Sequence, residues 1–80
     1  MNTVKLYTAE TQDNAIVTRK HLEECKSTSL RVAMRTATRR QVWAGTELLV
    51  VAVYSRDGEE IHSEIAASKR GGKWTVKSDL

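Results

Sequence analysis

The sequence predicts an α+β fold in which one amphipathic helix packs on a four- to five-stranded, mostly antiparallel sheet. Three observations support this: an apolar stripe at helical spacing within residues 29–46, a β-branched run over residues 46–54, and glycine-containing turns between short strand-like stretches. A helix and a sheet bury their apolar sides by packing together in two layers. With 80 residues the chain is expected to form a single domain over residues 1–80.

The helix is predicted from its apolar stripe and its end signals. The stripe recurs at i, i+3, i+4 and i+7 and consists of Leu30, Ala33, Met34 and Ala37. Ser29 or Thr28 can cap the first turn, since a hydroxyl accepts a hydrogen bond from an orphan backbone N–H. Gly45 can adopt the left-handed conformation that ends a helix or the loop after it. The helix is therefore expected to stop at Gly45.

A row of arginines follows another side of this helix. Arg31, Arg35 and Arg39 are spaced by four, so their guanidinium groups line one ridge. Arg40 adds a fourth positive charge, and residues 29–46 contain no acid. Like charges at this spacing repel mildly, so the ridge indicates either tolerant solvent or an anionic partner.

Five stretches before and after the helix have the composition of β-strands. They are residues 3–8, 15–28, 46–54, 60–68 and 73–77. The second stretch is ambiguous, because residues 20–26 either continue the strand of residues 15–18 or form a short helical turn. Residues 46–54 have the character of a central strand.

Two turns are predicted to close hairpins in the second half of the chain. The Asp57-Gly58 pair is the type I′ signal, and residues 69–72 end in two glycines. Ile61 and Ile65 are expected on a common strand face. The core is expected to form where the helix stripe packs on the side chains of Leu48, Val50 and Ile65.

Composition indicates a globular protein with a mild basic bias. The formal net charge is +3 and the pI is about 9.3, which suits nucleic acid or an acidic protein surface. Cys25 is the only cysteine, so no internal disulfide can form, and without a paired base it is expected to be a small buried or half-buried thiol. No apolar leader opens the chain, and the longest apolar run, residues 48–54, is too short to cross a bilayer. We therefore expect a cytoplasmic protein.

No set of residues typical of catalysis is present, and we expect no enzyme activity, no cofactor and no metal. Glu60, His62 and Glu64 alternate along one strand and could crowd a cation, but a solvated strand face is the better interpretation. The turn over residues 69–73 lacks the Walker spacing and a following helix. It predicts a basic hairpin turn, although two glycines beside three cations would also let a phosphate approach the backbone.

The candidate binding residues lie at the end of the helix. Arg35 and Arg39 are one turn apart, and Gln41 and Trp43 follow them. Arginine offers a fork of donors and a flat face, glutamine an amide, and tryptophan a large rigid contact area. We expect Arg35, Arg39 and Gln41 to be exposed. Trp43 is either a contact residue or a core residue that covers the sheet edge.

The same segment resembles the helix-to-strand signature of the ninth type I-F anti-CRISPR family, whose members are small phage proteins with a helix over an antiparallel sheet. The matching residues are Ser29, Leu30, Ala33, Arg35, Ala37, Arg39, Gln41, Trp43, Gly45 and Thr46. Residues 65–74 resemble the closing hairpin of that family, with an alanine, a charged glycine turn and a tryptophan. Met34 replaces a cation of the family pattern, and Trp43 replaces a phenylalanine.

The resemblance implies an inhibitor that acts in the host bacterial cytoplasm. It would bind the repeated backbone subunits of a type I-F CRISPR surveillance complex, beside the guide RNA, and block target DNA hybridisation. The implied contact residues are Arg35, Arg39, Gln41 and Trp43. Arg31 lies outside the matched motif and is expected to matter less. The family also promotes non-specific duplex DNA binding by the inhibited complex, which suits a secondary basic patch of Lys69, Arg70 and Lys73.

Two other functions use the same residues. The chain could bind nucleic acid directly, with Arg31, Arg35, Arg39 and the turn over residues 69–73 as phosphate clamps. Such binding would fall steeply with salt. Alternatively, the helix ridge could bind a different host protein. The oligomeric state does not follow from the sequence.

Overall fold

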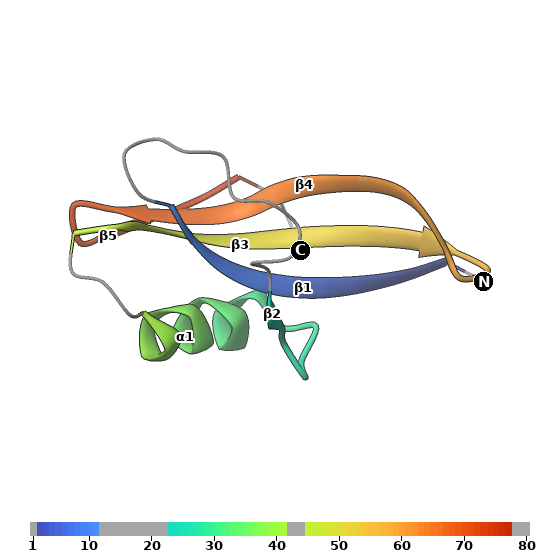
Figure 1. Ribbon diagram of the computed structural model, residues 1–80, viewed down its shortest axis with the longest axis horizontal. Helices are drawn as coiled ribbons and strands as arrows, with labels where there is room; N and C mark the ends of the chain where they lie inside the picture. The colour runs from blue at the N-terminus through green and yellow to red at the C-terminus, as the bar shows by residue number, and fades with distance from the viewer. Residues whose placement is uncertain (1, 12–22, 42–44, 78–80) are drawn as a thin grey trace.

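The computed structural model describes residues 2–11, 23–41 and 45–77 (Figure 1). Within these ranges the chain forms one helix and five strands, which confirms the predicted α+β class. The elements in chain order are β1 (Asn2–Thr11), β2 (Glu23–Glu24), α1 (Leu30–Arg40), β3 (Glu47–Arg56), β4 (Glu59–Arg70) and β5 (Lys73–Val76). Figure 1 shows α1 lying across one face of the sheet, near one end of the long strands.

The described strands form one antiparallel sheet in the order β2-β1-β3-β4-β5. The β-branched run becomes β3, the central strand, as its composition predicts. β1 pairs with β3 from Asn2 opposite Arg56 to Thr11 opposite Glu47. This register places alternate residues of both strands on the side of α1.

Small side chains line the contact between helix and sheet. Ala33 and Ala37 of α1 are buried, and they face an equally buried group from the sheet. That group consists of Leu6, Leu48, Val50, Ala52, Ala66 and Ala67. The alanines on both sides are small, so most of the buried volume of this core comes from Leu6, Leu48 and Val50.

The helix begins where predicted and ends earlier than predicted. Ser29 is its N-cap, and the Val32 N–H donates to the Ser29 hydroxyl at 3.5 Å. The prediction that the helix stops at Gly45 is wrong, because α1 ends at Arg40. Gln41 leaves the helical region (φ −56°, ψ 126°) as the chain turns back toward β3. Gly45 has a φ of +81° and lies in the loop that follows.

The predicted placement of Ile65 in the core is also wrong. Val50 pairs with Ala67, but Val51 pairs with Ile65, so Ala66 is an extra residue in β4. Such a bulge resets the alternation of the strand. Ile65 therefore lies on the side of Val51, away from the core, and is 40% exposed. Ala66 and Ala67 take its expected place. A second irregularity at Ile61 means that Ile61 and Ile65 are not related by simple alternation.

The stretch predicted as a second strand is only partly described. Residues 15–18 lie outside the described residues. Within residues 23–28, strand structure is confined to Glu23 and Glu24, which pair with Thr8 and Tyr7 of β1. The Cys25 N–H then donates to the Leu6 carbonyl at 2.7 Å and continues the pairing by one residue.

Both hairpin turns have the backbone that their sequences predict. Asp57 and Gly58 have φ values of 52° and 85°, and Gly71 and Gly72 have values of 61° and 83°. Two successive positive φ values define the type I′ turn, whose twist matches that of the flanking strands. The glycines are therefore required by conformation rather than by lack of space, since a Cβ at either Gly58 or Gly72 would meet no atom within 4 Å.

Gly58→Ala is expected to lower the free energy of unfolding by about 1 kcal/mol, because an L side chain is strained at positive φ. Gly58→Asn should cost less, since asparagine tolerates this region. Urea denaturation followed by circular dichroism measures both. Equal stability of the alanine variant and the parent would contradict this account of the turn.

Candidate functional site

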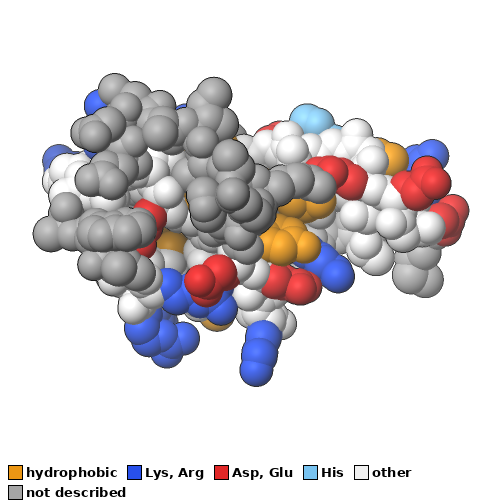
Figure 2. Space-filling view, in the orientation of Figure 1, with side chains coloured by type: hydrophobic (Ala, Val, Ile, Leu, Met, Phe, Trp, Pro, Cys, Tyr) orange, Lys and Arg blue, Asp and Glu red, His pale blue; other side chains and the backbone are white. Residues whose placement is uncertain are grey.

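Three arginines form an exposed row on α1, which we call the arginine face (Arg31, Arg35 and Arg39). All three are exposed, whereas Ala33 and Ala37 between them are buried against the sheet. Figure 2 shows Lys and Arg side chains projecting from the side of the molecule where α1 lies in Figure 1. The helix thus holds the row at fixed spacing and points it to solvent, as the sequence predicts for Arg35 and Arg39.

No described acid neutralises the arginine face. The ion pairs that lysines and arginines form in the described ranges join Lys5 to Glu24 and Arg40 to Glu23. The first turn of α1 contains no acid. Over residues 2–11, 23–41 and 45–77, no hydrogen bond or ion pair involves any guanidinium group of the face. Nothing in the described part of the chain therefore balances the charge of these three guanidinium groups.

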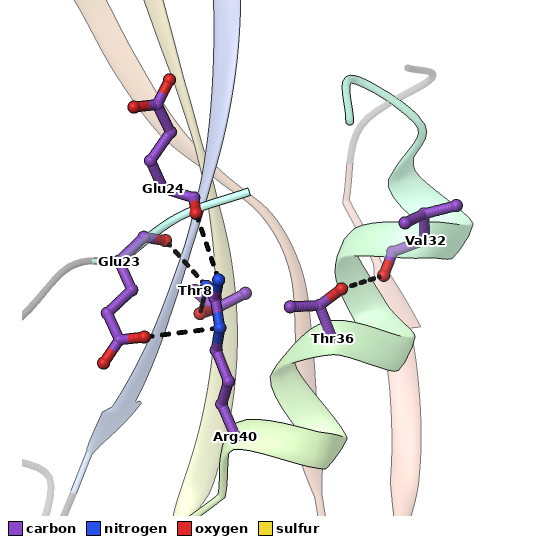
Figure 3. Close-up of polar contacts among 6 residues, drawn as sticks. All are labelled: Thr8, Glu23, Glu24, Val32, Thr36 and Arg40. Atoms are coloured by element: carbon purple, nitrogen blue, oxygen red, sulfur yellow. Dashed lines mark hydrogen bonds and ion pairs between the residues drawn. The ribbon is translucent and has the colours of Figure 1, made fainter. Parts of the chain in front are cut away.

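Arg40 has a structural role that sequence reasoning missed. Its guanidinium reaches from the end of α1 to the β1–β2 pair (Figure 3). Nη1 donates to the Thr8 hydroxyl at 3.0 Å and to the Glu23 carbonyl at 3.3 Å, while Nη2 donates to the Glu24 carbonyl at 3.3 Å. Nε lies 3.3 Å from the Glu23 carboxylate. This arginine fixes β2 to the end of the helix.

Cys25 lies beside this clamp and is buried, as expected. Burial raises the pKa of its thiol, and the charge of Arg40 and a hydrogen bond from Arg40 partly oppose that rise. A neutral thiol is a weak nucleophile. The arrangement thus indicates a packing role for Cys25.

Arg40→Ala is expected to destabilise the fold by about 1–2 kcal/mol, because it removes several charge-assisted hydrogen bonds at a partly solvated site. Arg39→Ala, one residue earlier and without described partners, should change stability by less than about 0.5 kcal/mol. Urea denaturation of the two variants compares the residues directly. Equal effects would contradict the structural role of Arg40.

Gln41 is less exposed than the sequence predicts. It is half-buried at the helix C-cap, and its Nε2 donates to the Thr46 hydroxyl at 3.3 Å. That hydroxyl donates in turn to the Glu10 carboxylate at 2.7 Å. The expectation of an exposed Gln41 is therefore wrong, since its amide ties the end of α1 to the start of β3. Trp43 lies outside the described residues.

The secondary basic patch is divided between two sides of the sheet. Arg70 and Lys73 pair across the β4–β5 turn and are both exposed. Lys69 pairs with Trp74, is half-buried and points to the opposite face. The structure thus brings Arg70 and Lys73 together and separates Lys69 from them.

Three acids gather at the β3–β4 turn, at one end of the molecule, which measures 39 × 23 × 20 Å. The end of α1 and the β4–β5 turn lie at one end in Figure 1, and the β3–β4 turn lies at the other. Asp57, Glu59 and Glu60 are exposed at or beside the β3–β4 turn. Figure 2 shows acidic side chains at that second end. The end of α1 and the β4–β5 turn therefore lie away from these three acids.

The side chains of Tyr54, His62 and Glu64 form a cluster on one face of β3 and β4. The rings of Tyr54 and His62 stack with centroids 5.7 Å apart, and the Tyr54 hydroxyl donates to Glu64 at 3.1 Å. His62 Nε2 lies 3.4 Å from the Glu64 carboxylate. The bulge at Ile61 interrupts the alternation between Glu60 and His62, so the predicted row of three is broken. Among the described residues no three His, Cys, Asp or Glu side chains could together hold a metal ion.

Within the described ranges, α1 lacks the length and apolar character that a bilayer span requires. Comparisons with family models, with curated proteins and with solved structures find no match for this chain. The functional argument therefore depends on the chemistry of the arginine face.

Proposed function

We propose that the protein is an anti-CRISPR inhibitor, which binds the backbone subunits of a type I-F surveillance complex through the arginine face and blocks target DNA hybridisation. The observation that carries this proposal is the exposure of Arg35 and Arg39 without any described partner. These two residues belong to the segment that resembles the anti-CRISPR signature. In this role Arg31 extends the contact by one turn.

The spacing of the arginine face suits a row of acids on a protein. At 1.5 Å per residue, the eight steps from Arg31 to Arg39 span about 12 Å along the helix. Each guanidinium can bind a carboxylate through two parallel hydrogen bonds, a geometry that lysine cannot provide. A rigid helix pays little conformational entropy when it presents these groups, which favours tight binding.

Binding to a purified type I-F surveillance complex tests the proposal. Size-exclusion chromatography of the complex with excess protein should show the protein eluting with the complex. The bound protein should resist about 0.3 M salt, since buried bidentate pairs are screened less than surface charges. Absence of co-elution at micromolar concentrations would overturn the proposal.

A second candidate, direct binding to nucleic acid, is favoured by the position of Arg70 and Lys73 at the same end as the arginine face. We expect this binding to be weak at physiological salt, because a net charge of +3 releases few counterions. Mobility shifts with duplex DNA measure it. Nanomolar, salt-sensitive binding by the protein alone would make nucleic acid the preferred target. A protein that binds neither DNA nor the complex would leave another host protein as the target of the same helix ridge.

A further inference from the structure

The outer edge of β4 has an open stretch. β4 pairs with β3 from Glu59 to Lys69, but with β5 only from Ala67 to Arg70. The Lys77 N–H donates to the Ala66 carbonyl at 2.8 Å and extends the contact by one residue. No strand in the described part of the chain covers the outer side of residues 59–65. An open edge of this kind is a template for pairing with another strand.

Exposed isoleucines lie on this open stretch. Ile61 is 55% exposed and Ile65 is 40% exposed. His62, Ser63 and Glu64 between them are exposed as well. Aliphatic side chains on an open strand edge lose unfavourable contact with water when a second strand pairs there. The stretch therefore has both the backbone and the side chains of a strand interface.

We propose that residues 61–65 pair antiparallel with residues 61–65 of a second copy of this chain, about a two-fold axis through Ser63. The sequence of the stretch is self-complementary under this axis. His62 of each copy faces Glu64 of the other. The resulting interface is isologous, so each favourable pair occurs twice. The proposal does not depend on the proposed function.

Within one copy, contacts already hold the His62 and Glu64 side chains in place for this interface. His62 and Glu64 lie on one face of β4, with Nε2 3.4 Å from the carboxylate. Tyr54 stacks on His62 and donates to Glu64, which restricts both side chains. A second copy would extend this pair into four groups in which imidazole rings alternate with carboxylates. Such a cluster favours the dimer.

The charges also select the register. A two-fold axis perpendicular to the sheet allows only shifts of two residues, because paired residues must share a face. A shift in one direction places His62 opposite His62 and removes both His62–Glu64 pairs, and a shift in the other places Glu64 opposite Glu64. Like charges directly opposite each other are unfavourable. Pairing centred on Ser63 is the register that keeps both His62–Glu64 pairs.

Within residues 2–11, 23–41 and 45–77, the helix lies away from this edge. α1 packs mainly on β1 and β3, at the other side of the sheet. β5 limits the pairing, since the Ala66 carbonyl is occupied by Lys77. The pairing between the two copies therefore ends at residue 65. The dimer would form one continuous sheet across both copies.

Sedimentation velocity of the full chain between about 10 µM and 1 mM tests the proposal. A reversible dimer is expected within this range. His62→Glu should raise the dissociation constant about tenfold, because it places two acids opposite each other at two symmetric positions. The charge swap His62→Glu with Glu64→His should restore dimerisation. A chain that stays monomeric throughout, or a dimer unaffected by His62→Glu, would overturn the proposal.

A cysteine at the two-fold axis provides an independent measurement. Directly opposed strand residues have Cβ atoms about 4.5–5.5 Å apart, close enough for disulfide formation after small adjustments. Ser63→Cys should therefore form a covalent dimer under mild oxidation. Thr75→Cys, exposed on β5 away from the axis, is the matched control, and the parent chain controls for Cys25. Crosslinking of Ser63→Cys no faster than that of Thr75→Cys would contradict the proposed axis.

Discussion

The double variant Arg35→Ala with Arg39→Ala is expected to lose inhibition of a type I-F surveillance complex while its melting temperature stays nearly unchanged. Both arginines are exposed and have no described partner, so their removal breaks no contact within the described fold. Alanine also has the highest helix propensity, and the like-charge repulsion at this spacing disappears. Each arginine in a desolvated, bidentate contact contributes about 2 kcal/mol or more to binding. A phage-plaquing assay with CRISPR-competent bacteria measures the loss.

A matched variant separates the arginine face from overall charge. Lys26→Ala with Lys77→Ala also lowers the formal net charge from +3 to +1, since it removes two exposed cations outside α1. This variant should inhibit as well as the parent. Arg31→Ala should have an intermediate effect. Full inhibition by the Arg35 and Arg39 double variant would show that the arginine face is not the binding site.

Leu48→Ala is expected to lower the free energy of unfolding by about 2–5 kcal/mol. Leu48 is 1% exposed and is one of the three largest fully buried side chains. It belongs to the core beneath α1, where alanines from the helix and from β4 cannot expand to fill the cavity. Small domains are stable by only about 5–15 kcal/mol, so this loss is a large share of the total. Urea denaturation followed by circular dichroism gives the difference.

Val76→Ala serves as the control for this prediction. Val76 is 52% exposed at the end of β5, so its truncation should cost less than about 0.5 kcal/mol. A cost below about 1 kcal/mol for Leu48→Ala would mean that the core beneath α1 is not the main source of stability.

Local signals in the sequence were sufficient for most of the fold. The Ser29 cap, the β-branched run of β3 and the two glycine turns each act through neighbouring residues, so each could be recognised along the chain. The bulge at Ala66 could not, because it depends on the pairing of β4 with β3, which no local pattern in the sequence reveals. That single extra residue explains why Ile65 was expected in the core and lies outside it.

The sequence predicts only part of the candidate site, because some of its contacts join residues that are distant in the chain. Helical spacing was enough to place Arg31, Arg35 and Arg39 on one exposed side. The roles of Arg40 and Gln41 depend on partners distant in sequence, namely Thr8 and Glu10 through Thr46. No local pattern marks such partners. Lys69 lies on the opposite face of the sheet from Arg70 and Lys73 because of where β4 ends and β5 begins. The sequence of the turn does not by itself fix these boundaries.

The rate of target DNA hybridisation by a purified type I-F surveillance complex tests the central claim most directly. The complex is incubated with the protein before a fluorescently labelled target duplex is added, and strand opening is followed with time. The arginine face predicts that a saturating amount of the parent protein stops hybridisation and that the Arg35 and Arg39 double variant leaves it at the uninhibited rate. Hybridisation at the uninhibited rate in the presence of saturating parent protein would contradict the claim.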